Sequence, residues 1–119
     1  MNLGELGAKG ESMVARFLQK KGHTILKRNY TCRFGEIDII AEKDDTIIFI
    51  EVKSRSENAI VPGLEAVDSH KQRRILAAAT DYIVKTKTEL QPRFDVALVI
   101  ASERNGKMLY SLNYYKNAF

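Results

Sequence analysis

Two runs of β-favouring residues, separated by a short polar segment, constrain this chain more than any other feature. Residues 35–42 and 46–54 are both rich in isoleucine, and Lys43-Asp44-Asp45 lies between them. Apolar, β-branched runs on either side of a short polar turn are typical of an antiparallel β-hairpin. The segment therefore predicts two neighbouring antiparallel strands.

Helical and strand-like patterns account for the other elements. The predicted order is a helix over 5–21, strands over 23–30, 35–42 and 46–54, a helix over 68–87, and strands over 93–102 and 107–112. A strand, a long helix and a second strand form a right-handed crossover, which makes the two strands parallel. The expected fold class is α/β, a mixed sheet flanked by helices in two or three layers, depending on where the first helix packs.

Composition limits the class of protein. The chain has 119 residues, 45% of them hydrophobic, which is enough to form one core without a disulfide or structural metal. Its single cysteine, Cys32, cannot form an internal disulfide. No run approaches the roughly 20 apolar residues of a membrane-spanning helix, and the start lacks a signal-peptide pattern. We therefore expect a single cytoplasmic domain over 1–119.

Charge is segregated along the first half of the chain, although the net charge is only +4. No acid lies between Val14 and Phe34, and the bases there are Arg16, Lys20, Lys21, Lys27, Arg28 and Arg33. Such a basic run is the electrostatic signature of a protein that binds a polyanion. Acidic residues then gather between Glu36 and Glu51. The alternative is that these charges only solvate the surface.

Alternation along the hairpin strands predicts a cluster of charged side chains. Glu51 and Lys53 share one face of their strand, and hairpin pairing can bring Asp38 across from them. Their neighbours are apolar, so the carboxylates should be partly buried, where an unpaired charge is costly. Two carboxylates from adjacent strands suit Mg²⁺. The alternative is a simple surface salt bridge between Glu51 and Lys53.

These residues resemble known sequence motifs. Asp38 followed by Glu51-Val52-Lys53 resembles the motif of the PD-(D/E)xK nuclease superfamily, with Ile37 where that motif has proline. Their surroundings resemble the YraN family of bacterial proteins, which is similar to archaeal Holliday junction resolvases. The stretches that carry this resemblance are Gly7-x-x-Gly10-Glu11, Gly35-Glu36-Ile37-Asp38-Ile39-Ile40-Ala41, Phe49-Ile50-Glu51-Val52-Lys53-Ser54-Arg55, Lys71-x-x-Arg74, Arg93-Phe94-Asp95-Val96 and Asn117-Ala118-Phe119.

The resemblance implies a restriction-endonuclease-like core, ordered α-β-β-β-α-β with an additional C-terminal strand. It implies that Asp38 and Glu51 hold Mg²⁺ or Mn²⁺ and that Glu11 in the first helix adds a further ligand. It also implies that Lys53 orients or deprotonates the attacking water. Adjacent carboxylates raise the pKa of a lysine, so we expect a positioning and charge-stabilising role for Lys53. The alternative for Glu11 is a helix N-terminal acid that interacts with the helix dipole.

Several basic residues are candidates for binding nucleic acid. Lys71 and Arg74 share a face at the start of the second helix and could bind phosphates that flank the scissile one. Arg55 begins a segment reaching Pro62 that forms either a flap near the site or a plain connection. The remaining candidates are Lys27, Arg28 and Arg33. A solvated surface is the alternative reading for these side chains.

The other polar residues are assigned no catalytic part. His23 and His70 lack partners at zinc-binding spacing and are expected on the surface. Asp95 begins an apolar strand, so it is expected to be structural and to need an arginine or backbone amides as partners. The tail over 114–119 is expected to pack back on the core or to form a dimer contact.

The leading expectation is a Mg²⁺-dependent endonuclease acting on DNA, including branched or junction DNA. Because a resolvase must cut two strands, a homodimer is a corollary. One alternative is a nucleic-acid-binding protein with a nuclease-like fold and little or no catalysis, since basic patches suffice for binding. Another is an interaction module that binds neither DNA nor metal.

Overall fold

A computed structural model describes residues 2–59 and 67–119 and contains every predicted helix and strand. The elements are α1 (Leu3–Lys20), β1 (Thr24–Cys32), β2 (Gly35–Lys43), β3 (Thr46–Ser56), a 3₁₀ turn (Glu57–Ala59), α2 (Ser69–Thr86), β4 (Gln91–Arg104) and β5 (Lys107–Tyr115). Arg55 thus lies in β3 and not in a flap, while Pro62 lies outside the described residues. No helix in the described parts of the chain is long and apolar enough to cross a membrane.

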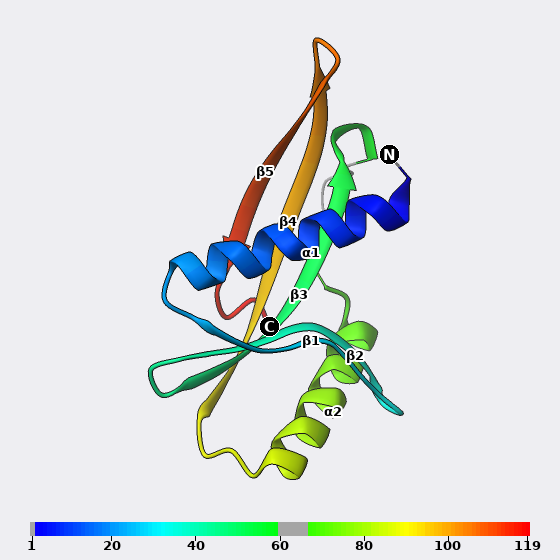
Figure 1. Ribbon diagram of the computed structural model, residues 1–119. Coiled ribbons are helices and arrows are strands. Elements are labelled where there is room, and N and C mark those ends of the chain that lie inside the picture. The colour runs from blue at the N-terminus through cyan, green and yellow to red at the C-terminus, as the bar shows by residue number, and fades with distance from the viewer. Residues whose placement is uncertain (1, 60–66) are drawn as a thin grey trace.

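The strands form one mixed sheet in the order β1-β2-β3-β4-β5 (Figure 1). The β2–β3 hairpin is antiparallel, with Lys43 opposite Thr46 at its turn. Strands β3 and β4 are parallel, as expected for two strands joined through α2, and β5 returns antiparallel to β4. The predicted mixed α/β arrangement is confirmed.

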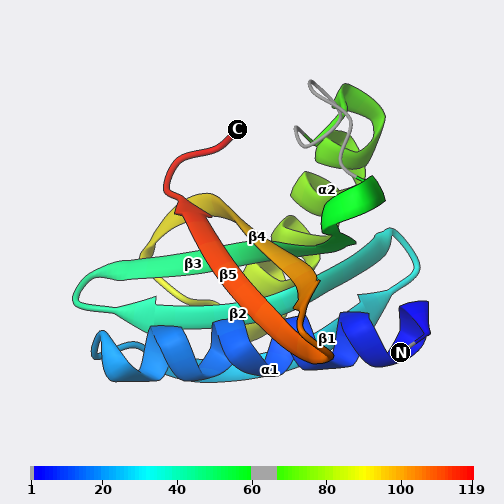
Figure 2. The ribbon, with the colours of Figure 1, turned by 90° about the horizontal axis from the view of Figure 1, so that it is seen from above.

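The helices cover opposite faces of the sheet, which makes three layers (Figure 2). The α1-side core contains Val14 and Leu18 of α1 together with Ile48 and Ile50 of β3. The α2-side core contains Ile75, Ala78 and Ala79 of α2 together with the β3 residues Ile47 and Phe49. Because side chains alternate along a strand, Glu51 and Lys53 continue the face of Phe49 and point toward the α2 side.

Helix α1 approaches β3 closely at one glycine. A Cβ atom at Gly10 would lie 2.0 Å from Ser54 Oγ, whereas one at Gly7 would meet no atom within 4 Å. The Ser54 hydroxyl is buried and, among the described residues, has no hydrogen-bond partner. Only a residue without a side chain fits at position 10 in this packing.

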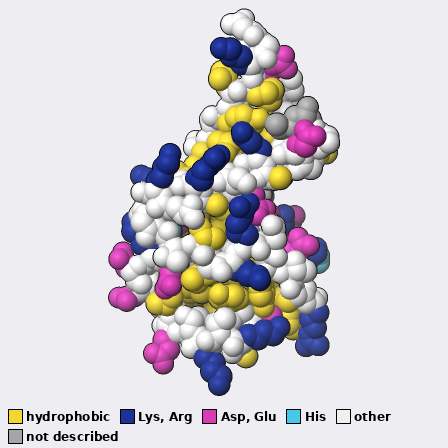
Figure 3. All heavy atoms as spheres, viewed as in Figure 1, with side chains coloured by type: hydrophobic (Ala, Val, Ile, Leu, Met, Phe, Trp, Pro, Cys, Tyr) yellow, Lys and Arg dark blue, Asp and Glu magenta, His cyan; other side chains and the backbone are white. Residues whose placement is uncertain are grey.

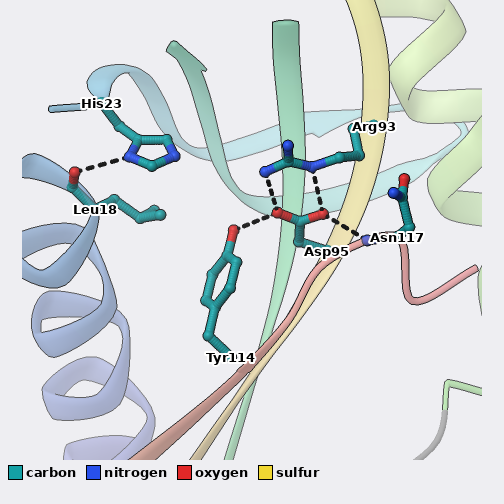
Figure 4. Close-up of polar contacts among 6 residues, drawn as sticks. All are labelled: Leu18, His23, Arg93, Asp95, Tyr114 and Asn117. Atoms are coloured by element: carbon teal, nitrogen blue, oxygen red, sulfur yellow. Dashed lines mark hydrogen bonds and ion pairs between the residues drawn. The ribbon is translucent and has the colours of Figure 1, made fainter. Parts of the chain in front are cut away.

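A fully buried carboxylate fastens the C-terminal segment to the sheet (Figure 4). Asp95 accepts hydrogen bonds from Arg93 Nε at 3.0 Å and Nη2 at 2.9 Å, from the Tyr114 hydroxyl at 2.6 Å, and from the backbone N–H of Asn117 at 3.0 Å. Burial and the bond to Asp95 raise the pKa of Tyr114. At the C-terminus, the centre of the Phe119 ring lies 5.3 Å from the centre of the Phe94 ring. The structural role expected for Asp95 and the packing of the tail are confirmed.

Candidate active site

Strands β2 and β3 stop pairing where the candidate acids begin. The pair of residues furthest from the hairpin turn is Ile39 and Ile50. One residue further on, Asp38 Oδ2 accepts a hydrogen bond from the backbone N–H of Val52 at 2.7 Å. A side chain thus replaces the backbone carbonyl that would continue the ladder. The prediction that the hairpin brings Asp38 to the Glu51 strand is confirmed.

The half-buried Asp38 and the buried Glu51 side chains form an acidic pair. They are close enough to share a hydrogen bond, and Glu51 is only 7% exposed. Burial raises the pKa of the Asp38 carboxyl, although the Val52 N–H opposes this. Burial, followed by repulsion from the charge of Asp38, raises the pKa of Glu51. The pair therefore carries negative charge that its surroundings compensate only in part.

Lys71 forms an ion pair with this acidic pair, and its Nζ lies 2.5 Å from Glu51 Oε1. Helix α2 begins beside it. The Asp68 side chain caps that helix by accepting a hydrogen bond from the Lys71 backbone N–H at 2.8 Å. The cap fixes the first turn, and the Lys71 side chain then reaches across to β3. Lys53 is also buried, at 7% exposure, on the strand face that carries Glu51.

The acidic pair opens into a cleft of about 710 Å³ between the β1–β2 turn and the start of α2. Arg33, Lys71 and Arg74 line this cleft together with the two acids. The structure thus brings together three of the predicted nucleic-acid-binding residues around two of the predicted metal ligands. Glu36 and Asp68 also line it, so the cleft combines carboxylates with three basic side chains, which suits an anionic substrate held near a cation.

Glu11 faces a different pocket. A cavity of about 340 Å³ is lined by Glu11, Arg55, Ser54 and Asp38, so Asp38 borders both spaces. Glu11 accepts a hydrogen bond from Arg28 Nε at 3.3 Å. Within residues 2–59 and 67–119, no group of three or more His, Cys, Asp or Glu side chains is arranged to hold a metal. The assignment of Glu11 as a ligand remains a prediction.

The remaining basic candidates are dispersed over the surface. Figure 3 shows Lys and Arg side chains spread over the α1 side of the molecule, with acidic side chains among them. Lys27 is exposed on β1 and lines neither of the two pockets. Arg28, also exposed, pairs with Glu11 and donates to Ser12 Oγ at 3.3 Å. The basic run is therefore exposed but divided between the cleft and the α1 face.

Two cleft residues were not predicted from the sequence. His70 is exposed, as expected, and it also lines the cleft one residue before Lys71. Phe34 also lines the cleft, is 40% exposed, and has the Arg33 guanidinium 4.7 Å from its ring centre. The available signal for Phe34 was its place in the turn that leads into the Asp38 strand.

Comparison with known proteins supports the relationship suggested by the motifs. Residues 10–99 match the family described as Uncharacterised protein family UPF0102. The chain belongs to the UPF0102 family. A UPF0102 protein of Clostridium perfringens is 46% identical over 115 residues, which cover 96% of this chain and 93% of the relative. The YraN-like resemblance is confirmed at this level.

Two further relatives match over the whole chain. The UPF0102 protein of Dictyoglomus thermophilum is 45% identical over 120 residues, covering 100% of both proteins. That of Caldanaerobacter subterraneus is 41% identical over 121 residues, covering 100% of this chain and 98% of the relative.

Proposed function

We propose that this protein is a metal-dependent endonuclease that hydrolyses phosphodiester bonds in DNA. The observation that carries the proposal is the acidic pair of half-buried Asp38 and buried Glu51, which lines a cleft with Arg33, Lys71 and Arg74. Two adjacent carboxylates withdrawn from water are costly to a fold unless a cation compensates them. The order of α1, β1–β3, α2 and β4 also fits the restriction-endonuclease-like core expected of the PD-(D/E)xK superfamily.

The donor atoms at the pair fit a hard divalent cation. Mg²⁺ in enzymes takes one or two carboxylates and completes its shell with water and substrate phosphate oxygens. Asp38 and Glu51 would supply the carboxylates, and a bound cation would offset the burial that raises the pKa of each. A bound metal would lower the pKa of a water molecule and neutralise charge developing on the phosphate.

The surrounding side chains have parts that follow from their positions. Lys53, buried on the same strand face as Glu51, would orient the attacking water and stabilise negative charge on the phosphate. Arg33 and Arg74 line the cleft, where they would bind the phosphates on either side of the scissile bond. Asp38 would keep its orientation through the hydrogen bond from Val52 N–H.

One observation favours a second candidate, a DNA-binding protein with little or no catalysis. The Lys71 ammonium on Glu51 neutralises part of the acidic pair without any metal. A protein of this kind needs only the basic walls of the cleft, and its DNA affinity would fall steeply with salt. The two candidates differ in whether phosphodiester bonds are broken.

The test is cleavage of labelled single-stranded, duplex, flap and four-way-junction DNA with Mg²⁺ or Mn²⁺. We expect cleavage by the wild type, with Asp38→Asn and Glu51→Gln each slower by about 100-fold or more, because a metal contributes several kcal/mol to such reactions. Paired symmetric cuts in the junction would indicate two copies acting together.

Asp44→Asn is the matched control because it removes the same charge from the exposed β2–β3 turn. It should cleave at the wild-type rate. If wild type and variants are equally inactive on every DNA while the wild type binds DNA in a salt-dependent way, the second candidate replaces the first. Absence of both cleavage and binding would contradict both candidates.

A further inference from the structure

The Lys71 side chain lies where a metal ligand would be needed. Its Nζ is 2.5 Å from Glu51 Oε1, and Glu51 is one of the two carboxylates in the proposed metal site. The two partners differ in exposure, at 50% for the Lys71 side chain and 7% for that of Glu51. The carboxylate is fixed within the sheet, whereas the lysine reaches it from the cleft.

A metal ion at this pair would compete with the ammonium, because both are cations that neutralise the same Glu51 carboxylate. Mg²⁺ binds oxygen at about 2.0–2.1 Å, and two cations at such a distance from one carboxylate oxygen would repel each other strongly. Lysine is a compact charge on a long flexible stem, so its head can move while its backbone stays in place. The Asp68 cap holds that backbone, since its Oδ1 accepts from Lys71 N–H at 2.8 Å.

The Lys71 ammonium, once displaced from Glu51, would move into the cleft. Lys71 and Arg74 both line it, on the same side as the start of α2, and Arg33 lines it from the β1–β2 turn. An ammonium released from Glu51 would remain in this cleft, which Glu36 and Asp68 also line. A phosphate group held there by Arg33 and Arg74 would be a favourable partner for it.

We propose that Lys71 is an exchangeable counter-ion: it neutralises Glu51 until a divalent metal binds, and it then contacts a phosphate of the DNA. The inference rests on the proposed function, because it requires the metal and the substrate of that site. It assigns Lys71 as a residue that links the two ligands. Metal binding frees Lys71 for DNA, and DNA draws Lys71 away from Glu51.

Linkage makes this coupling reciprocal. If metal raises the affinity for DNA by some factor through Lys71, DNA raises the affinity for metal by the same factor. Removing the ammonium should therefore have opposite effects on the two ligands. Metal should bind more tightly because it has no competitor, and DNA should bind more weakly because it has lost a contact.

The experiment measures Mn²⁺ binding by calorimetry without DNA, for the wild type, Lys71→Met and Arg73→Met. Arg73 is the matched control because it is exposed in the same helical turn and does not line the cleft. We expect Lys71→Met to bind Mn²⁺ at least about 5-fold more tightly than Arg73→Met, in line with usual coupling strengths. DNA binding in Ca²⁺ should be weaker for Lys71→Met than for Arg73→Met.

Damage to the fold would lower the affinity for both Mn²⁺ and DNA. Opposite changes in the two affinities are therefore specific to counter-ion exchange. Equal or weaker Mn²⁺ binding by Lys71→Met, beside clear binding by the wild type, would overturn the inference and leave the proposed function standing. Failure of every variant to bind Mn²⁺ would overturn both. Far-UV circular dichroism establishes that each variant is folded.

Discussion

Two buried acidic sites lie on neighbouring strands of this sheet and are built differently. Asp95 of β4 lies in register with Ile50 of β3, one residue before Glu51. Asp95 is surrounded by donors fixed in the fold, namely two nitrogens of Arg93, the Tyr114 hydroxyl and the Asn117 N–H. In the Asp38–Glu51 pair, Asp38 accepts a hydrogen bond from the Val52 N–H, and Glu51 pairs with the ammonium of the half-exposed Lys71 side chain.

The difference separates an acid that serves stability from acids available to a ligand. The four donors on Asp95 fill its lone pairs, so the carboxylate needs no further partner. The Asp38–Glu51 pair combines burial with mutual repulsion and opens into a cleft. A carboxylate pair that the fold leaves under-compensated is a candidate functional site on physical grounds.

The largest effect on stability is expected at Asp95. Asp95→Asn leaves the half-buried Arg93 guanidinium without its fully buried charged partner, so the free energy of unfolding should fall by about 3–5 kcal/mol. Urea unfolding followed by circular dichroism measures this. Glu57→Gln is the control, since it breaks the exposed pair with Arg104, and its urea midpoint should not change. Equal effects for the two variants would contradict the structural importance of Asp95.

A smaller effect is expected where α1 packs near the open site. Gly10→Ala places a Cβ atom 2.0 Å from Ser54 Oγ, and overpacking of this kind costs about 1–3 kcal/mol. Gly7→Ala meets nothing within 4 Å and should stabilise the helix by about 0.5–1 kcal/mol. Thermal unfolding distinguishes the opposite signs. Ser54→Ala should partly restore the Gly10→Ala protein, and no restoration would argue against this contact.

The smallest expected effect is a gain of stability when Asp38 of the acidic pair is replaced by asparagine. Burial raises the pKa of Asp38, so the folded state binds its proton more tightly than the unfolded state does. Wild-type stability should therefore decline as the pH rises from about 3.9, the usual pKa of aspartate, through the raised value. Asparagine does not titrate, and its oxygen can still accept from Val52 N–H.

Asp38→Asn should consequently unfold at a higher temperature than the wild type at pH 7, and this advantage should vanish toward pH 3. Thermal unfolding of both proteins across this pH range measures the difference. A wild type that is more stable than Asp38→Asn at pH 7 would show that the fold already compensates the acidic pair.

The sequence was sufficient for the features that depend on local geometry. Strand alternation and a short turn placed Asp38 near Glu51, because register in a hairpin follows from the turn. The burial of Asp95 in an apolar strand indicated that it needs an arginine or amides. The extension of β5 to Tyr115 was not predicted, because the alternation ends at Leu112 and pairing with β4 continues the strand.

Features that depend on docking between distant elements could not be predicted. The contact of Lys71 with Glu51 requires the position of α2 on the sheet, which no local pattern contains. The same holds for Glu11, which pairs with Arg28 across α1 and β1 and faces the smaller pocket. Phe34 and His70 join the cleft for the same reason, because the β1–β2 turn and the start of α2 meet only in the folded chain.

We propose that the Asp38–Glu51 pair lowers the stability of the fold and supports phosphodiester cleavage. The most direct test is the Mg²⁺-dependent cleavage rate of Asp38→Asn relative to Asp44→Asn, on protein shown to be folded. The account predicts a rate lower by about 100-fold or more for Asp38→Asn and a wild-type rate for Asp44→Asn. Equal cleavage by the two variants would contradict the account, because it would place the chemistry away from the acidic pair.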